Sequence, residues 1–311
     1  MQYVVSLEGL SREYGGQRVV DELTFDVAAA ELFGIVGPDG AGKTTTLRML
    51  AGILRPSAGD ARLAGISVVR DPEAVKRHIA YMSQRFGLYA DLTVRENIDF
   101  YADLYRIPHP KRAPRIERLY EFSGLGPFEN RLAGQLSGGM KQKLGLCAAL
   151  IHEPEILLLD EPTFGVDPIS RRDLWLIVHE MVASGVTVIV STAYLDEAER
   201  CDRVALFHNG RVVSIDTPVA LQQRLADRVV ALRSAEPRRA RDRLRRHPAV
   251  NQAVLFGDVV HVTLRSSLND WPAVRRDLKS TGISVDWESP IEPSLEDVFM
   301  DLAQNREAGG A

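Results

Sequence analysis

The stretch Gly37-Pro38-Asp39-Gly40-Ala41-Gly42-Lys43-Thr44-Thr45 decides the fold of this 311-residue chain. It matches the pattern G-x-x-x-x-G-K-[ST], in which glycines let successive backbone N–H groups point at one anion. An apolar run at residues 32–36 precedes it and predicts a buried strand, and residues 45–51 predict a helix. Because this strand–loop–helix order is the context that the motif requires, we expect a phosphate-binding loop at the start of a helix.

Each residue of this loop has an expected task. Lys43 would reach the outer phosphates, and the Thr44 hydroxyl would bind Mg²⁺. The other expected nucleotide-binding positions in the loop are Gly37, Asp39, Gly40, Ala41, Gly42 and Thr45. Asp39 adds an acid beside a bound phosphate, although its backbone N–H can still donate. The alternative is a glycine-rich turn that binds nothing, and the loop alone does not separate a GTPase, a kinase and a transport ATPase.

Length and composition limit the class of protein. A chain of 311 residues predicts one large domain or two smaller ones, and the apolar fraction of 45% is ordinary for a globular protein. The net charge of −4 gives no overall attraction to nucleic acid. The 2 cysteines, Cys147 and Cys201, form no metal pattern and suggest a reducing compartment. With no run of 18 apolar residues and no signal-like N-terminus, we expect a soluble protein or one held at a membrane by a partner.

The first 222 residues predict an α/β fold of the P-loop NTPase type. Short alternating segments before residue 30 indicate an antiparallel β subdomain, with strands at 4–7, 18–20 and 23–27. A helical insert is expected at about residues 85–145, with helices at 93–105 and 116–122 joined by a basic, proline-containing link at 108–114. The later alternation of strands and helices predicts a parallel core sheet.

Residues 226–304 predict a separate accessory domain. The order of strand 229–232, helix 237–246, a hairpin at Gly257-Asp258, helix 271–278 and strand 283–286 indicates a ferredoxin-like α+β sandwich. A last helix is expected at 295–303, followed by a disordered tail at 305–311. The arginines of helix 237–246 favour a solvated face; contact with anionic lipid or a partner domain is the alternative, and nucleic acid is disfavoured because no aromatic residues are interleaved.

Two further motifs indicate chemistry. Asp160 and Glu161 follow a predicted buried strand, and because adjacent strand residues alternate faces we expect different tasks: Asp160 for Mg²⁺, Glu161 for an attacking water. The alternative is a solvated carboxylate pair. Ser137-Gly138-Gly139 opens a long helix and offers a second anion-binding terminus, unless Ser137 only caps it. Two such termini in one chain suggest a dimer, in which one chain's loop faces the other's Ser-Gly-Gly.

Over residues 3 to about 220 these motifs resemble the ATP-binding subunits of ABC transporters. The stretch 136–142, Leu-Ser-Gly-Gly-Met-Lys-Gln, is similar to the specific signature motif of that family. The resemblance implies ATP and Mg²⁺ as ligands, with Gln84 as the glutamine that contacts Mg²⁺ and water, and Tyr14 as the adenine-stacking aromatic. It implies Asp160 as a metal ligand beside Thr44, and Glu161, with Gln84 and Lys43, as the catalytic residues.

The resemblance also implies partners. The loop Phe164-Gly165-Val166-Asp167 is similar to the family's segment that communicates across a dimer of ATPase subunits. The stretch 293–299 is similar to the C-terminus of the drug-, lipid- and polysaccharide-exporting branch. The chain would then sit on the cytoplasmic face of the cell membrane through a separate permease. Aromatic residues near Gln84 would pass its motion to membrane helices; these are Phe86, Tyr89, Phe100 and Tyr101.

One position departs from the family pattern. The family has a histidine just after the strand predicted at 186–191, and this chain has Ala193 there. Loss of one donor to a developing transition-state charge costs roughly 10²–10³ in rate, about 3–4 kcal/mol. We therefore expect ATP binding with slow turnover by the isolated chain, and we favour a heterodimer with a complete ATPase subunit over a homodimer.

Two function classes follow. The first is an ATP hydrolase subunit that drives export through a separate permease, and the second is a mainly non-catalytic, regulatory ATP-binding partner of a complete ATPase. Soluble ABC proteins of translation or DNA repair are disfavoured, because they carry tandem ATPase units or long coiled-coil insertions and this chain has neither. The transported substrate is chosen by another chain and cannot be read from this sequence.

Overall fold

The computed structural model describes residues 3–84 and 87–309, and the chain divides into two compact units. The first comprises Met1–Tyr194 with Cys201–Ser214, and the second comprises Leu195–Arg200 with Ile215–Ala311. The predicted boundary at residues 222–226 differs from this division. Helix α8 (Pro218–Gln223) packs on α11 (Leu295–Gly309) and therefore belongs to the second unit.

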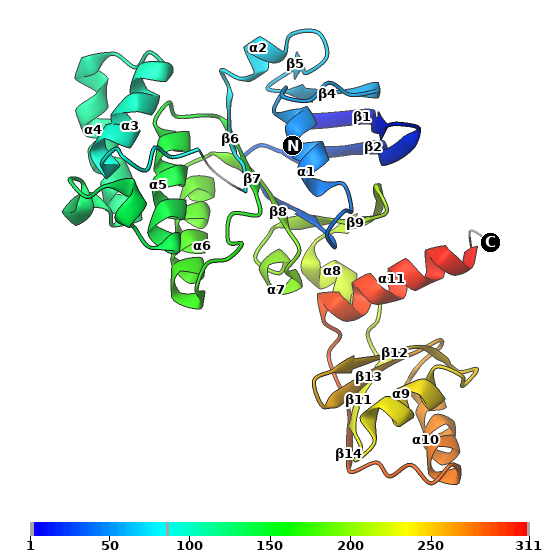
Figure 1. Cartoon of the computed structure of the whole chain (residues 1–311). Helices are drawn as coiled ribbons and strands as arrows, with labels where there is room; N and C mark the ends of the chain where they lie inside the picture. Colours follow the sequence, from blue (N-terminus) through cyan, green and yellow to red (C-terminus); the bar gives the residue numbers. More distant parts are fainter. Residues whose placement is uncertain (1–2, 85–86, 310–311) are drawn as a thin grey trace. The chain divides into compact units, whose positions relative to one another are not determined.

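A six-stranded sheet forms the centre of the first unit (Figure 1). Its strand order is β10-β9-β3-β8-β7-β6, and β3, β6, β7, β8 and β9 pair in parallel. The strands are β3 Leu32–Val36, β6 Ile79–Met82, β7 Ile156–Asp160, β8 Thr187–Thr192, β9 Arg203–His208 and β10 Arg211–Asp216. All residues of β3, β7 and β8 are buried, as expected of parallel strands covered on both faces. The phosphate-loop motif and the Asp-Glu pair thus lie at one edge, where the carboxyl ends of β3 and β7 meet.

An antiparallel sheet of order β2-β1-β4-β5 forms the predicted β subdomain. Its strands are β1 Tyr3–Tyr14, β2 Gln17–Ala28, β4 Ala58–Leu63 and β5 Ile66–Ser67. The segments predicted as separate strands at 18–20 and 23–27 form one strand with an irregularity at Glu22, which has a φ of 51°. A local break in the polar–apolar alternation therefore marks a bulge and not the end of a strand.

Helices form the insert in the first unit (Figure 1). They are α3 Val94–Leu104, α4 His109–Ser123, the short turns η1 Gly126–Phe128 and η2 Ala133–Gln135, and α5 Gly138–Leu150. Thr93 and Glu96 form a capping box at the start of α3, which confirms the helix predicted there. The link predicted at 108–114 is wrong, because α4 begins at His109; Pro110 lies in the first turn, where a missing N–H costs little, and Pro114 is accommodated inside the helix. The other helices of the unit are α1 Lys43–Leu50, α2 Pro72–Val75 and α6 Pro168–Ala183.

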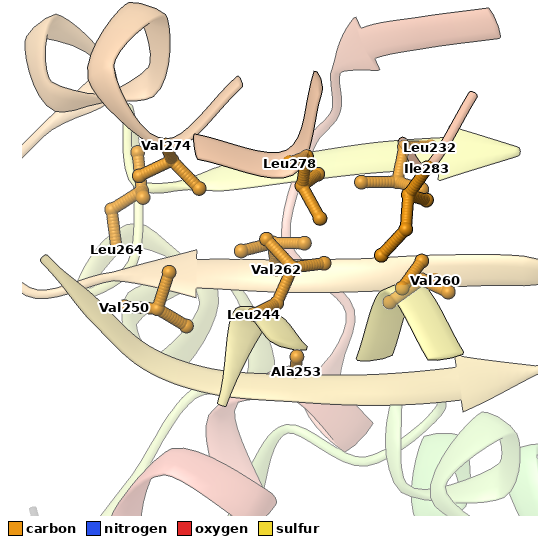
Figure 2. Packing of buried hydrophobic residues seen from close by; sticks show 11 residues of the cluster. Leu232, Leu244, Val250, Ala253, Val260, Val262, Leu264, Val274, Leu278 and Ile283 are labelled. Carbon is orange, nitrogen blue, oxygen red and sulfur yellow. The ribbon is translucent and has the colours of Figure 1, made fainter. Parts of the chain in front are cut away.

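The second unit contains an antiparallel sheet of order β12-β13-β11-β14, the arrangement of a ferredoxin-like sandwich. Its elements are β11 Val229–Arg233, α9 Pro237–Leu244, β12 Val250–Phe256, β13 Val259–Leu264, η3 Leu268–Asp270, α10 Trp271–Ser280 and β14 Trp287–Pro290. Side chains of α9 and α10 pack on one face of the sheet, among them Leu244, Val274 and Leu278 (Figure 2). The strand predicted at 283–286 is wrong, because β14 starts at Trp287 and the Ile283 side chain belongs to the core.

Two short helices and the C-terminal helix complete the second unit. They are α7 Leu195–Ala198, α8 and α11. Helix α11 continues past its predicted end at residue 303 as far as Gly309, because no glycine or proline interrupts residues 295–308, so most of the tail predicted to be disordered is helical. Across residues 3–84 and 87–309, none of the helices combines the length and the apolar character needed to cross a bilayer.

Candidate functional site

The loop between β3 and α1 has the backbone that its glycines predict. Gly40 and Gly42 have φ values of 78° and 100°, which L-residues with a side chain rarely adopt. A Cβ on Gly42 would also lie 2.8 Å from the Val19 carbonyl oxygen, and a Cβ on Gly37 would lie 2.4 Å from that of Phe207. The first turn of α1 therefore follows a tightly packed loop, and its backbone N–H groups, which lack intrahelical acceptors, face the loop.

Lys43 places a buried positive charge inside this loop. Its side chain is 4% exposed, and its Nζ donates to the carbonyl oxygens of Gly37 at 2.8 Å and Pro38 at 3.1 Å. The same Nζ lies 3.2 Å from Glu161 Oε1. The cation predicted to reach the phosphates thus lies between the loop and the expected catalytic carboxylate.

Asp160 ends β7 and is 1% exposed. Its Oδ1 accepts hydrogen bonds from Thr44 Oγ1 at 2.9 Å and from Ser191 Oγ at 2.8 Å, and its Oδ2 accepts one from Tyr81 OH at 3.1 Å. A buried carboxylate needs such donors, because burial of an unpaired charge is strongly unfavourable. The contact with Thr44 brings together the two predicted Mg²⁺ ligands.

Glu161 also contacts the phosphate loop, but its backbone conformation differs from that of Asp160. Glu161 has a φ of 48°, and its N–H donates to Ser191 Oγ at 3.0 Å, so the chain turns sharply after the strand. Its Oε2 accepts from Gln84 Nε2 at 3.2 Å. The expectation that strand alternation separates Asp160 from Glu161 therefore does not apply, since Glu161 lies beyond the strand, but the two carboxylates do have different partners.

A pocket of about 350 Å³ opens over the loop. Its lining residues are Val19, Asp39, Gly40, Ala41, Gly42, Lys43, Thr44, Thr45, Gln84, Glu161 and Phe164. Residues predicted from four separate stretches thus line one cavity. Gly37 and Asp160 lie just behind it, and hold Lys43 and Thr44 through the contacts above.

The oxygen ligands at the pocket fit a small hard cation. Thr44 Oγ1 and Asp160 Oδ1 lie 2.9 Å apart, and Gln84 contributes an amide at the opening. Mg²⁺ binds through one or two such protein oxygens and completes its shell with water and phosphate oxygens. In the part of the chain that the structure describes, no group of three or more His, Cys, Asp or Glu residues could hold a metal ion, so such a site would depend on the nucleotide.

Tyr14 lies outside this pocket lining. It ends β1, its ring is 46% exposed, and the Arg12 guanidinium carbon lies 4.4 Å from the ring centroid. Val19, on the neighbouring strand β2, does line the pocket. Stacking of adenine on Tyr14 stays a prediction.

The Ser-Gly-Gly stretch also lies away from the lining of this pocket. Ser137 caps α5, since its Oγ accepts from Met140 N at 3.3 Å, as the simpler interpretation predicts. A Cβ on Gly139 would lie 2.2 Å from Ser170 Cβ and Oγ on α6, whereas a Cβ on Gly138 would have only the Gly165 carbonyl oxygen within reach, at 4.0 Å. Gly139 therefore has a packing role within the chain, and Gly138 remains open to other contacts.

Ala193 follows β8 at the edge where β3 and β7 also end, and it is exposed. The next residue, Tyr194, packs its ring 4.5 Å from the Arg171 guanidinium carbon. Three of the aromatic residues expected near Gln84 form a cluster, in which the ring of Phe100 lies 4.6 Å from Tyr89 and 5.4 Å from Tyr101. The fourth, Phe86, lies outside the described residues.

Sequence reasoning assigned no role to two residues that contact Asp160. Ser191 lies on β8 and Tyr81 on β6; the rest of β6 is apolar, whereas β8 also contains Thr187 and Thr192. A polar group in a buried strand is a signal that it has a partner. Which carboxylate each hydroxyl meets depends on the strand order, and the sequence did not predict that order.

Comparison with known proteins gives three results. The family model described as ABC transporter matches residues 20–164. The chain is 42% identical over 304 residues to the probable multidrug ABC transporter ATP-binding protein YbhF of Escherichia coli K12, covering 96% of this chain but 52% of YbhF, so it spans about half the length of that relative. It is 35% identical over 302 residues to the daunorubicin/doxorubicin resistance ATP-binding protein DrrA of Streptomyces peucetius, covering 92% of DrrA. A solved ATP-binding subunit of an ABC transporter, 31% identical, aligns with 71% of this chain and 92% of its own length at a TM-score of 0.65.

Proposed function

The chain belongs to the family of ATP-binding proteins of ABC transporters, and on that premise we propose that it binds and hydrolyses ATP with Mg²⁺ to drive export through a separate permease. The observation that carries this proposal is one pocket lined by Lys43, Thr44, Gln84 and Glu161. Asp160 lies behind Thr44.

These residues can be assigned complementary roles. Backbone N–H groups of the loop and the Lys43 ammonium bind the β- and γ-phosphates. Thr44 and Asp160 would hold Mg²⁺, which supplies positive charge to the phosphate oxygens. Glu161, with Gln84 bonded to it at 3.2 Å, orients the attacking water and accepts its proton. Glu161 contacts both Lys43 and the Gln84 amide, whereas the other acid of the lining, Asp39, is part of the loop itself, so Glu161 is the proposed base.

A second ATPase subunit completes the proposed site. The Ser137-Gly138-Gly139 stretch lies outside the lining of the chain's own pocket, and Gly138 has open space for a Cβ. This placement supports an arrangement in which the stretch contacts the nucleotide of a partner subunit. The exposed Phe164, 55% accessible at the pocket's rim, would lie at the same subunit boundary.

Ala193 makes the chain's own site the weaker of the two. A methyl group there donates no hydrogen bond to a γ-phosphate, and loss of one such donor costs roughly 10²–10³ in rate. ATP binding is less affected, because the loop and the Mg²⁺ ligands remain. Pairing with a complete ATPase gives one slow and one fast site, so a heterodimer is favoured, and a homodimer would have two slow sites.

The names of the relatives support a proposal for the partner and the cargo. YbhF is named as a probable multidrug transporter component and DrrA as a daunorubicin/doxorubicin resistance protein. By analogy, this chain works on the cytoplasmic face beneath a membrane permease that exports drugs. The Tyr89–Phe100–Tyr101 cluster is the proposed contact with that permease.

The turnover of the purified chain tests the role of Ala193. We expect ATP binding together with slow hydrolysis, and we expect Ala193→His to raise kcat by at least about tenfold with little change in nucleotide affinity, since it restores a donor used in the transition state. Lys43→Ala is the control that abolishes binding. Brisk hydrolysis with Ala193 in place would contradict the proposed slow site.

A second candidate is a mainly regulatory ATP-binding subunit, which the same Ala193 favours. Glu161→Gln in the native pair separates the two functions. Loss of a measurable part of the ATPase rate means that this chain's own site turns over, whereas an unchanged rate assigns hydrolysis to the partner and leaves ATP here as a structural ligand.

A further inference from the structure

Tyr81 contacts the carboxylate that the proposed function places at the Mg²⁺ site. Its hydroxyl donates to Asp160 Oδ2 at 3.1 Å, while Oδ1 accepts from Thr44 and Ser191. Three residues later, Gln84 donates to Glu161. One short segment, residues 81–84, therefore donates one hydrogen bond to each of the two consecutive carboxylates.

The strand register explains this contact. Strands β6 and β7 pair in parallel, with Tyr81 opposite Leu158. Because side chains alternate along a strand, Tyr81, Leu158 and Asp160 lie on the same face of the sheet. Asp160 is two residues beyond Leu158, a rise of about 6.6 Å, which a tyrosine side chain can span and a shorter hydroxyl residue cannot.

The phenol stays a donor over the whole working pH range. Burial raises the pKa of Tyr81 to about 12, the negative charge of Asp160 adds to this effect, and the Arg48 side chain opposes it. Asp160 itself is 1% exposed, so its orientation depends on its hydrogen-bond donors and not on solvent. Removal of the hydroxyl would leave Oδ2 without this donor, and the Asp160 carboxylate could then rotate toward another one.

We propose that Tyr81 is a positioning residue for Asp160: its hydroxyl fixes Oδ2 so that Oδ1 stays beside Thr44, and this sets the affinity of the nucleotide-loaded protein for Mg²⁺. The inference rests on the proposed function, since it concerns the Mg²⁺ site of that function. The inference also gives β6 a second role, because a shift of this strand would disturb Asp160 through Tyr81 and Glu161 through Gln84.

The test is Tyr81→Phe, which removes one oxygen and keeps the ring. Binding of a fluorescent ATP analogue is titrated over free Mg²⁺, and binding in EDTA is measured separately. We expect affinity in EDTA to be unchanged, and the Mg²⁺ concentration at half-maximal enhancement of binding to rise about tenfold, as is typical when a partner of a metal ligand is lost. Thermal unfolding without ligand verifies that the variant is folded.

Tyr120→Phe is the matched control, because it also removes a buried tyrosine hydroxyl, which lies on α4, has no hydrogen-bond partner among the described residues and is not among the donors to Asp160. We expect this variant to keep the wild-type Mg²⁺ dependence. An unchanged Mg²⁺ requirement in Tyr81→Phe, or an equal rise in both variants, overturns the inference. Failure of the wild-type chain to bind the analogue at all would instead contradict the proposed function.

Discussion

At the scale of single residues, one glycine of the signature stretch has a structural reason to be glycine. The ideal Cβ of Gly139 would overlap Ser170 on α6 at 2.2 Å, and the atoms in its way include Ser170 Cβ, which a rotamer change does not move. The neighbouring Gly138 has no such obstacle. Sequence reasoning assigned both glycines to anion binding, because the contact with Ser170 is visible only once α5 and α6 are packed.

This difference gives a prediction for two alanine variants. Gly139→Ala should lower the free energy of unfolding by about 1–3 kcal/mol, because α5 and α6 must separate to accept the methyl group. Gly138→Ala should leave it unchanged or raise it by up to about 1 kcal/mol, since alanine favours the helix. Urea unfolding of both variants measures the difference. Equal destabilisation would show that Gly139 is not limited by packing.

The residues at the proposed nucleotide pocket could be predicted one by one, and their wider surroundings could not. Lys43, Thr44, Asp160, Glu161 and Gln84 were predicted to meet, and they do. Four of them belong to local motifs whose chemistry the residues themselves indicate, and Gln84 was assigned through the family resemblance alone. Two of the three hydroxyls that donate to Asp160 come from strands β6 and β8, and nothing in their local sequence indicates which carboxylate they will face.

At the scale of elements, the end of α3 is joined to the core sheet through His152. Its ring stacks on Tyr105, the residue that follows α3, with centroids 3.9 Å apart, and its Nε2 lies 3.0 Å from the carbonyl oxygen of Ile79 at the start of β6. Since a carbonyl only accepts, Nε2 carries the proton. The other ring nitrogen, Nδ1, is buried without a hydrogen-bond partner among the described residues. Protonation would place an unpaired N–H there.

The joint should therefore weaken in acid. Burial lowers the pKa of His152, and the nearby Arg115 adds to this, while the bond to Ile79 opposes it. Below the unfolded-state pKa of about 6.5, the unfolded chain binds more protons at this residue than the folded chain does. The free energy of unfolding therefore decreases as the pH is lowered from about 6.5, until the pH passes the lower pKa of the folded state. Arg115 in turn is paired with Glu153, which keeps a positive charge beside the ring.

His152→Gln tests this joint, because a glutamine amide can donate to Ile79 and does not titrate. Urea unfolding at pH 7.5 and pH 5.5 should show a smaller acid loss of stability in the variant than in the wild type. His78→Gln is the control, since His78 is more exposed and bonded to Glu155 at 2.8 Å. A wild-type acid loss that persists fully in His152→Gln would assign it to other groups.

Helices and strands were predicted correctly where the hydrophobic periodicity was regular. The prediction was wrong where a short apolar run was buried without forming the expected element. Apolar residues at helical spacing predicted the helix at 93–105, which the structure shows as α3, and the βαβ alternation predicted the parallel sheet. The strand expected at 283–286 failed, because Ile283 is buried in the small core without pairing, and pairing begins at Trp287. Burial and strand pairing produce the same apolar signal in such short runs.

At the scale of the whole molecule, each compact unit has a hydrophobic core of its own. The cluster in Figure 2 is built only from residues 232–283, all in the second unit. The proposed nucleotide pocket is lined only by residues of the first unit. The sequence predicted two domains from the change of pattern near residue 225. The compact units divide earlier, between Ser214 and Ile215, and the packing of α8 against α11 has no local signature in the sequence.

Because the pocket and the second core share no residue, a ligand of the pocket should stabilise one unit selectively. ATP with Mg²⁺ at about 100 times its Kd adds about 2.7 kcal/mol to the stability of the state that binds it. For a unit of this size, that corresponds to a rise in Tm of roughly 5–10 °C. We expect calorimetry of the full chain to resolve two transitions, of which only one moves.

Lys43→Ala identifies the transition that moves, because it should abolish the shift while both transitions remain. Leu278→Ala, in the core of the second unit, should lower the other transition, by about 2–5 kcal/mol of stability, and leave the nucleotide shift intact. A single transition that both ATP and Leu278→Ala displace would mean that the two units unfold together. The stability of the C-terminal unit would then be coupled to the nucleotide site. Two separately movable transitions would mean that the two units unfold independently in this chain and that ATP binding does not stabilise the C-terminal unit.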